Sequence, residues 1–221
     1  MTMKHIVAGI AAIIAAPQAA SAAITWTDWT QAGSNTVVGN AGSVGVIYTG
    51  SYGFAQTSGG TDYWNTSAYS TWDGTIAPPP TSDIIALNGA GSKTISFTSA
   101  VQDVYLALTS WNGQSNVTFD KSFTQEGWVR GCGYWGCGLL TNVTSNSFTS
   151  TGESHGILKF AGPITSLTFS DSNDEYWHGI QVGIGASGAV PEPSAWALLI
   201  LGFGAVGAAL RRRSRASLAY A

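Results

Sequence analysis

Few side chains in this chain can exchange protons near neutral pH. Outside the apolar N-terminal segment the only histidines are His155 and His178. Glu153, Ser154 and His155 are adjacent, but a catalytic triad is assembled in space, and no Gly-x-Ser-x-Gly or Ser-x-x-Lys motif accompanies them. We interpret this tripeptide as a coincidence and expect no enzymatic activity.

The carboxylates leave one catalytic alternative open. Residues 23–188 contain eleven acidic and four basic residues, a net charge of −7. A glycoside hydrolase needs two carboxyl groups about 5–9.5 Å apart, and the fold rather than the sequence decides that separation. A hydrolase is therefore an alternative without support in the sequence. The scattered basic residues exclude nucleic acid as the main partner, because its phosphates require clustered Lys and Arg.

Acidic side chains are densest between residues 171 and 175. Asp171, Asn173, Asp174 and Glu175 offer the hard oxygen ligands that Ca²⁺ prefers. The run lacks the glycine and the distant glutamate of an EF-hand loop, and Asp-rich turns commonly cap their own backbone. Calcium at this turn is a weak hypothesis, and we expect no other metal or cofactor.

The two cysteines, Cys132 and Cys137, are separated by four residues in a glycine-rich stretch. A redox-active pair or two metal thiolates are the alternatives, but the spacing lacks the usual redox motif and zinc would need further ligands. We predict a disulfide that holds Tyr134 and Trp135 at a loop tip. Closing so short a loop stabilises the fold by roughly 2 kcal/mol in the chain-entropy treatment.

Tryptophan is unusually frequent, with nine residues in the chain. Flat aromatic faces can stack against sugar rings, and Trp111, Trp128 and Trp135 lie near Asn112 and Gln114, whose amides could pair with sugar hydroxyls. These tryptophans are the candidates for glycan binding. The competing interpretation is that they pack in the core and at its rim.

The elements that must position these residues are β-strands. Period-two alternation predicts strands around Ile95–Phe97, Val104–Leu108, Val117–Phe119 and Ile180–Ile184. Further separate strands are expected at the shorter apolar segments 24–29, 44–49, 84–87, 157–160 and 167–169. Long loops are expected at 50–60 and 73–82. The sequence predicts an all-β fold, an antiparallel β-sandwich of jelly-roll-like type without helices.

Both ends of the chain are apolar. Lys4 and His5 precede the run 6–16, and Ala20-Ser21-Ala22 supplies small residues for signal peptidase, so residues 1–22 are predicted to be a signal peptide. Residues 195–210 are apolar or small and are followed by arginines. They predict a short transmembrane helix in the inner membrane with a cytoplasmic basic end.

The residues before and within this C-terminal segment resemble a known sorting signal. The segment reads Val190-Pro191-Glu192-Pro193-Ser194-Ala195-Trp196-Ala197, with Gly202, Gly204, Arg211, Arg212 and Arg213 following. It resembles the PEP-CTERM signal of the PEPxxWA type. The chain departs from the common pattern in having Leu198-Leu199 where Met-Met is frequent and in its extra residues 217–221.

This resemblance implies that the chain is the substrate of an exosortase in a Gram-negative bacterium that makes extracellular polysaccharide. The expected organisation is a signal peptide (1–22), an exported β-sandwich (23–188), the sorting signal (189–215) and a short tail (216–221). We expect an inner-membrane-anchored precursor that is processed into a non-catalytic protein of the cell surface or biofilm matrix. A carbohydrate-binding module is the alternative.

Overall fold

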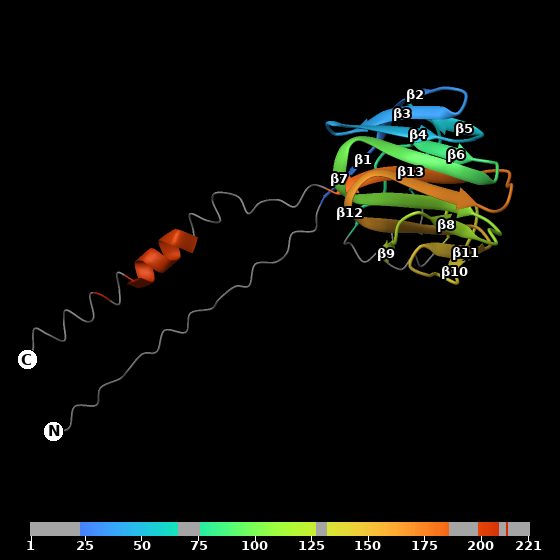
Figure 1. The fold of residues 1–221 in the computed structure, drawn as a ribbon. Helices are drawn as coiled ribbons and strands as arrows, with labels where there is room; N and C mark the ends of the chain where they lie inside the picture. The colour runs from blue at the N-terminus through green and yellow to red at the C-terminus, as the bar shows by residue number, and fades with distance from the viewer. Residues whose placement is uncertain (1–22, 66–75, 127–131, 186–198, 208–210, 212–221) are drawn as a thin grey trace, which may run out of the picture.

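The computed structural model describes residues 23–65, 76–126, 132–185, 199–207 and 211 (Figure 1). Between Ile24 and Gly185 it has thirteen strands, and every pair of strands is antiparallel. Their bounds are β1 (Ile24–Trp26), β2 (Asp28–Ala32), β3 (Thr36–Ala41), β4 (Val44–Thr49), β5 (Phe54–Gln56), β6 (Ile84–Leu87), β7 (Gly91–Trp111), β8 (Val117–Phe119), β9 (Thr124–Glu126), β10 (Leu139–Thr141), β11 (Ser147–Thr151), β12 (Ser154–Asp171) and β13 (His178–Gly185).

Two long strands, β7 and β12, run through both layers of the sandwich. Their pairing is regular from Ser92 to Ser96 and again from Asp103 to Leu108, with register shifts between these stretches. One shift, between Ala161 and Ile164, spans Gly162, whose φ of 107° is open to glycine but rarely to other residues. The irregularity bends the strand pair from one layer into the other.

Each layer is built outward from one half of this pair. The first half of β7 and the second half of β12 form a layer in the order β2-β3-β4-β7-β12-β8-β11-β10. The other halves form a layer in the order β5-β6-β13-β7-β12-β9, with β1 also paired to β13. The antiparallel β-sandwich predicted from the sequence is confirmed.

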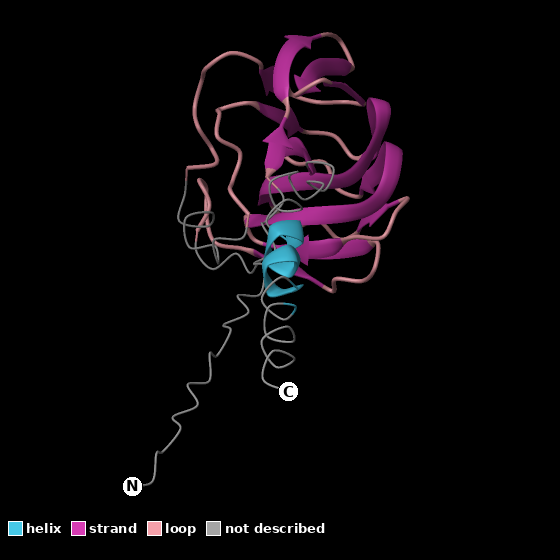
Figure 2. Ribbon diagram, turned by 90° about the vertical axis from the view of Figure 1, so that its left-hand side faces the viewer, coloured by secondary structure: helices cyan, strands magenta, loops and turns pink. Residues whose placement is uncertain are grey.

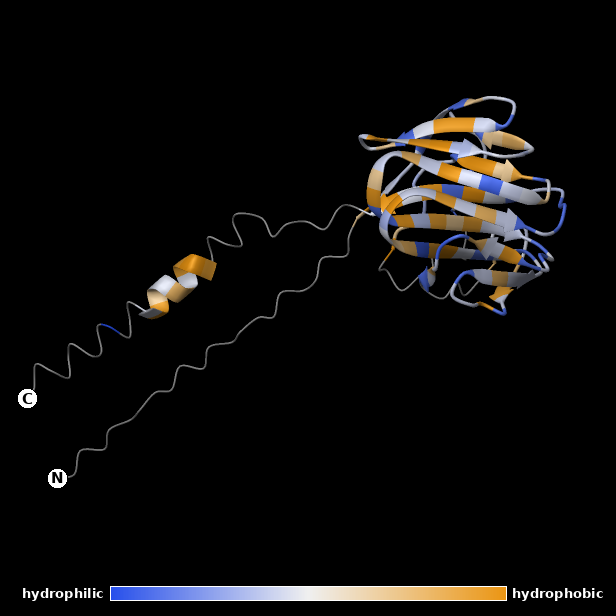
Figure 3. Cartoon of the chain, in the orientation of Figure 1, coloured by the Kyte–Doolittle hydropathy of each residue, from blue (hydrophilic) through white to orange (hydrophobic). Residues whose placement is uncertain are grey.

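The main core lies between the two layers. Ile95 and Phe97 of one layer and Val104, Leu106 and Leu108 of the other belong to a single buried apolar cluster. Along the strands, residues coloured as hydrophobic alternate with less hydrophobic ones in Figure 3. The alternation that predicted the strands therefore also identifies their inward faces.

A second apolar cluster covers the outer face of the β5–β9 layer. Ile84, Tyr105, Ala107 and Ile157 point away from the main core and pack with Trp64 and its neighbours in the 57–65 and 76–83 loops. Connecting loops gather at one side of the strand layers in Figure 2. Strand β13 is consequently buried along its whole length, and its polar residues His178 and Gln181 are buried with it.

The prediction of separate strands at 157–160 and 167–169 is wrong, because both segments belong to the single strand β12. Likewise Ile95 and Val104 share β7. Bends within a long strand interrupt the apolar pattern much as a turn does. The 50–60 segment contains the short strand β5 as well as loop.

A helix spans residues 199–207, with residue 211 also helical. Its apolar side chains are exposed, including Ile200, Leu201 and Phe203. Within the described residues no helix is long and apolar enough to cross a membrane. The ends of the predicted transmembrane segment lie outside the described residues, so that helix stays a prediction.

Candidate binding cleft

A cleft of about 440 Å³ lies at one end of the sandwich. Four segments contribute to it: the end of β7, the turn before β12, the turn before β13 and the disulfide loop. The lining residues are Ser110, Asn112, Trp135, Glu153, Glu175, Tyr176 and Trp177. Binding sites for small ligands commonly have volumes of ~300–1,000 Å³, so this cleft has the size of a ligand site.

A β-bulge in β7 places Ser110 at the floor. Leu108 pairs with Gly156 and Trp111 with Ser154, so Thr109 and Ser110 together face the single residue His155. Ser110 has a φ of 60°, a left-handed conformation that is uncommon outside glycine. Bulges of this kind redirect side chains, and here the bulge directs the Ser110 hydroxyl to Glu153.

The Glu153 carboxylate accepts a hydrogen bond at each oxygen. Ser110 Oγ donates to Oε2 over 2.5 Å, and Asn112 Nδ2 donates to Oε1 over 3.1 Å. The Asn112 backbone N–H in turn donates to both oxygens of Glu175, at 3.1 and 3.2 Å. Asn112 therefore holds two carboxylates from different turns, those before β12 and before β13, at the same floor.

A chain of charged side chains continues from Glu175 into the interior. Glu175 Oε2 lies 3.1 Å from His178 Nδ1, and His178 Nε2 lies 3.0 Å from Asp171 Oδ2. Asp171 Oδ1 accepts from Lys93 Nζ over 2.6 Å. Lys93 also donates to the carbonyls of Gly89 and Gly91, so its ammonium has three acceptors. The side chains of Lys93, Asp171 and His178 are fully buried.

These partners control the charge of the buried groups. Burial disfavours the imidazolium, but hydrogen bonds and the negative charges of Asp171 and Glu175 outweigh burial and raise the pKa of His178. Burial also disfavours the Asp171 carboxylate, yet His178 and Lys93 together lower the pKa of Asp171. Both ring nitrogens of His178 face carboxylates, an arrangement that suits the doubly protonated ring.

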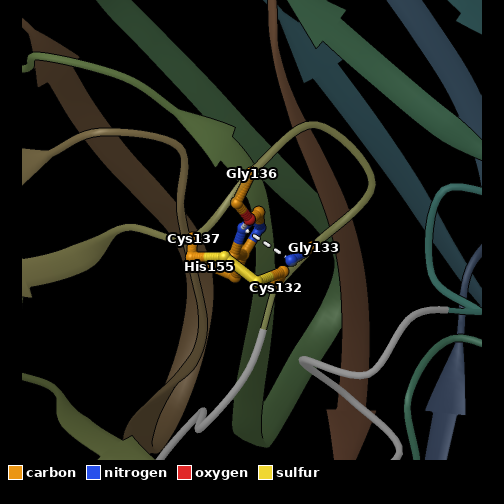
Figure 4. The surroundings of a disulfide bond; sticks show 5 residues. All are labelled: Cys132, Gly133, Gly136, Cys137 and His155. Carbon is orange, nitrogen blue, oxygen red and sulfur yellow. Dashed lines mark hydrogen bonds between the residues drawn. A yellow bond between two sulfur atoms is a disulfide. The ribbon is translucent and has the colours of Figure 1, made fainter.

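His155 lies beneath the disulfide loop, as Figure 4 shows. Its Nδ1 accepts from the Ser110 N–H over 3.3 Å, and Nε2 lies 2.9 Å from the Gly136 carbonyl oxygen. The Gly133 N–H also donates to Nε2 over 3.1 Å, so both ring nitrogens of His155 face backbone groups. Burial lowers the pKa of His155, although the Gly136 carbonyl and the charge of Glu153 partly oppose it.

Glycines let the disulfide loop lie directly on this floor. A Cβ atom at Gly133 would overlap the His155 ring, and one at Gly136 would come within 3.0 Å of the Glu153 side chain. The Gly133 N–H also donates to the Gly136 carbonyl over 2.8 Å. The glycine-rich sequence around the cysteines thus brings the loop against Glu153 and His155.

Aromatic rings form the rim. Trp135 is 58% exposed and Tyr176 is 94% exposed. The half-buried Trp177 makes edge contacts with Trp135 and with Tyr63, at ring-centre distances of 6.2 and 5.0 Å. Tyr63 and Trp135 each pack against Tyr134. The rim is therefore a connected aromatic cluster with exposed faces beside polar floor groups.

The disulfide between Cys132 and Cys137 is confirmed, and its loop carries the exposed Tyr134 and Trp135. For Trp111 the expectation of glycan binding is wrong: the ring is fully buried, lies against His178 and donates to the Gly179 carbonyl. Trp128 lies outside the described residues. Of the predicted glycan-binding tryptophans, only Trp135 is seen at the cleft.

The oxygen ligands proposed for calcium have protein partners instead. Asp171 holds Lys93 and His178, while Asn173 Oδ1 accepts from the Ser115 N–H and Asp174 Oδ1 from the Ala90 N–H. The part of the chain described here has no group of three His, Cys, Asp or Glu side chains placed to hold a metal. These oxygens bond to separate protein partners, and calcium at this turn stays a prediction.

Glu153, Ser154 and His155 do not form a triad. The Ser154 hydroxyl donates to the carbonyls of Thr151 and Gly152, whereas Ser110, distant in sequence, bonds to Glu153. Sequence reasoning did not identify Ser110 or Tyr176 as site residues. An aromatic pair directly after an acidic turn, Tyr176-Trp177, was the one signal that could have located the rim.

Residues 189–213 match a family described as the PEP-CTERM protein-sorting motif. The chain carries a PEP-CTERM sorting motif. Gly202, Gly204 and Arg211 of the motif are within the described helical residues, and Gly202 and Gly204 have open space around them. The remaining motif residues of interest, Val190, Pro191, Glu192, Pro193, Trp196, Ala197, Arg212 and Arg213, lie outside the described residues. Neither a curated protein nor a solved structure matches the chain.

The PEP-CTERM motif indicates a sorted, extracellular protein. It implies an exosortase as the processing enzyme. It also implies export, a membrane-anchored precursor and a final location at the surface. These statements concern the C-terminal segment, and the role of the β-sandwich must be argued from the cleft.

Proposed function

We propose that the exported sandwich is a non-catalytic protein of the cell surface or extracellular matrix of a Gram-negative bacterium, where it binds polysaccharide in the cleft. The observation that carries this proposal is the exposed aromatic rim of Trp135, Tyr176 and Trp177 above fixed polar groups. Aromatic faces accept the apolar C–H faces of sugars, while Asn112 and the carboxylates offer partners to hydroxyl groups.

The contacts of the floor residues support a binding role over catalysis. Each oxygen of Glu153 and Glu175 accepts from, or lies beside, a protein donor. His155 and His178 are likewise occupied at both ring nitrogens. A general acid or base needs an atom free to exchange a proton with substrate, and both imidazole rings have protein partners at each nitrogen.

Glycan binding can be tested by affinity electrophoresis of the exported full-length chain in gels that contain the host's extracellular polysaccharide. Trp135→Ala is expected to abolish the retardation, because it removes the most exposed ring of the disulfide loop that lines the cleft. Tyr134→Ala is the matched control, since Tyr134 is on the same loop and is also exposed but does not line the cleft. Equal retardation of all three proteins, or none, would contradict the proposal.

The processing step has a separate test in the intact mass of the protein from membranes and medium. Cleavage by signal peptidase after Ala22 and by an exosortase near Pro193 is expected to leave a product of about residues 23–193. Replacing Pro191, Glu192 and Pro193 with alanine should leave the C-terminal segment attached at the membrane. Retention of that segment in both proteins would mean a permanent anchor and would remove the exosortase from the proposal.

A further inference from the structure

The charges around the cleft do not balance. Lys93 and the doubly protonated His178 face Asp171 and Glu175, so this buried chain has two positive and two negative members. Glu153 receives only neutral donors, from Ser110 and Asn112. Both ring nitrogens of the nearby His155 contact backbone groups only, and burial lowers its pKa. Glu153 is therefore the one cleft carboxylate without a cationic partner among the described residues.

The surroundings of Glu153 likewise supply no positive charge from the described residues. No described Lys or Arg side chain lines the cleft. Carboxylate oxygens have about four lone-pair sites, and the two protein donors leave Glu153 with capacity to accept from a ligand. A group that donates several hydrogen bonds and carries a positive charge fits this position best, because charge-assisted hydrogen bonds are stronger than neutral ones.

The aromatic rim favours the same kind of ligand. Trp135, Tyr176 and Trp177 line the cleft together with Glu153, and aromatic faces attract cations through the negative face of the ring. The same faces stack on pyranose rings. A ligand with a sugar ring and a protonated amine can therefore contact both the walls and the floor of the cleft.

We propose that the cleft selects amino sugars with a free, protonated amine, with Glu153 as the residue that binds the ammonium group. This inference rests on the proposed glycan-binding function and names the class of glycan. Acetylation of the amine removes its charge, so an N-acetylated polymer is expected to bind more weakly. Partly or fully deacetylated amino-sugar polysaccharide is then the ligand of the exported domain.

The test is calorimetric titration of the exported full-length chain with a glucosamine tetramer and with the matching N-acetylglucosamine tetramer at about pH 6, where an ordinary amine is protonated. The free-amine tetramer is expected to bind about tenfold more tightly. Raising the salt concentration should reduce this preference, because salt screens the charge interaction. This test needs only the wild-type protein.

Glu153→Gln keeps the size and most hydrogen-bonding atoms of the side chain but removes its charge, so it should abolish the preference. Glu126→Gln makes the same change in net charge on β9, outside the cleft, and should retain the preference. Thermal unfolding of each variant confirms that it is folded. A folded Glu153→Gln that keeps the full preference would overturn the assignment to Glu153.

The remaining outcomes separate the two proposals. Equal binding of both tetramers, lost in Trp135→Ala, would overturn the amine selectivity and leave glycan binding intact. No binding of either tetramer or of the host polysaccharide would remove both. A lysine tetramer that binds as tightly as the glucosamine tetramer would show that an amine is recognised without the sugar, and would overturn the amino-sugar assignment.

Discussion

His155 and His178 both lie beneath the cleft and are almost completely buried, but their surroundings give them opposite charge preferences. His178 lies between the carboxylates of Asp171 and Glu175, and its pKa is raised. His155 contacts a backbone N–H of β7 and a carbonyl of the disulfide loop, and its pKa is lowered. Burial opposes the charge in both residues, so the difference comes from the partners.

The two histidines support different parts of the cleft. Around His178 the sandwich contains a buried ionic chain that reaches Lys93 and fixes Glu175. Around His155 a neutral ring supports the disulfide loop and its exposed aromatic residues. The cations on the His178 side are paired within the ionic chain, and the His155 side supplies none. Glu153 is therefore left as the acceptor for a cationic ligand.

The largest expected effect comes from breaking the ionic chain at its inner end. Lys93→Met removes the cation beside Asp171 and leaves the carbonyls of Gly89 and Gly91 without this donor. Loss of one member of a buried charge pair typically costs ~3–5 kcal/mol. The free energy of unfolding, measured with urea, is expected to fall by that amount.

Lys121→Met is the matched control for Lys93→Met. Lys121 pairs with Asp120 at 3.2 Å, but both side chains are about one-third exposed. Surface pairs of this kind contribute about 0–1 kcal/mol, because water screens them. If the two methionine variants lower the free energy of unfolding equally, the buried ionic chain around His178 does not stabilise the fold as we describe.

A smaller effect is expected from opening the disulfide loop. The double variant Cys132→Ser, Cys137→Ser should lower the free energy of unfolding by roughly 2 kcal/mol. Since Gly136 belongs to this loop and contacts His155, loosening it should expose the ring and move the pKa of His155 toward its ordinary value. NMR titration of both histidines measures this. An equal shift at His178, which does not contact the loop, would contradict a local effect.

The smallest expected effect is on the pH dependence of the free energy of unfolding. The two histidines should give slopes of opposite sign, each at most about 1.4 kcal/mol per pH unit. Because the folded pKa of His178 is raised, its stabilising contribution is present below about pH 6.5 and is lost as the pH rises through the folded pKa. Because the folded pKa of His155 is lowered, stability is lost as the pH falls from about 6.5 toward that pKa.

Matched substitutions should separate these slopes in urea unfolding between about pH 5 and 8, a range that lies above the ordinary pKa of Asp171. His178→Gln should flatten the decline on the alkaline side, and His155→Gln should flatten the decline on the acidic side. If both variants alter the same side, the assignment of opposite charges to the two histidines is wrong.

The sequence by itself determined the features encoded by neighbouring residues. Alternation located the cores of β8 and β13, short apolar segments located β4 and β6, and the spacing of Cys132 and Cys137 predicted their disulfide. The contiguous residues of the C-terminal segment predicted the PEP-CTERM motif. Each of these signals is local, because side-chain period and short motifs need no knowledge of distant contacts.

The tertiary structure alone decided which residues meet at the cleft. Lys93 and Asp171 are 78 positions apart, and Ser110 and Glu153 are 43 positions apart. Their meeting depends on the register of β7 with β12 and on the bulge opposite His155. Local patterns carry no information about that register, since many registers bury the same apolar faces. Long-range pairing, rather than composition, thus decided the charge states and the binding surface.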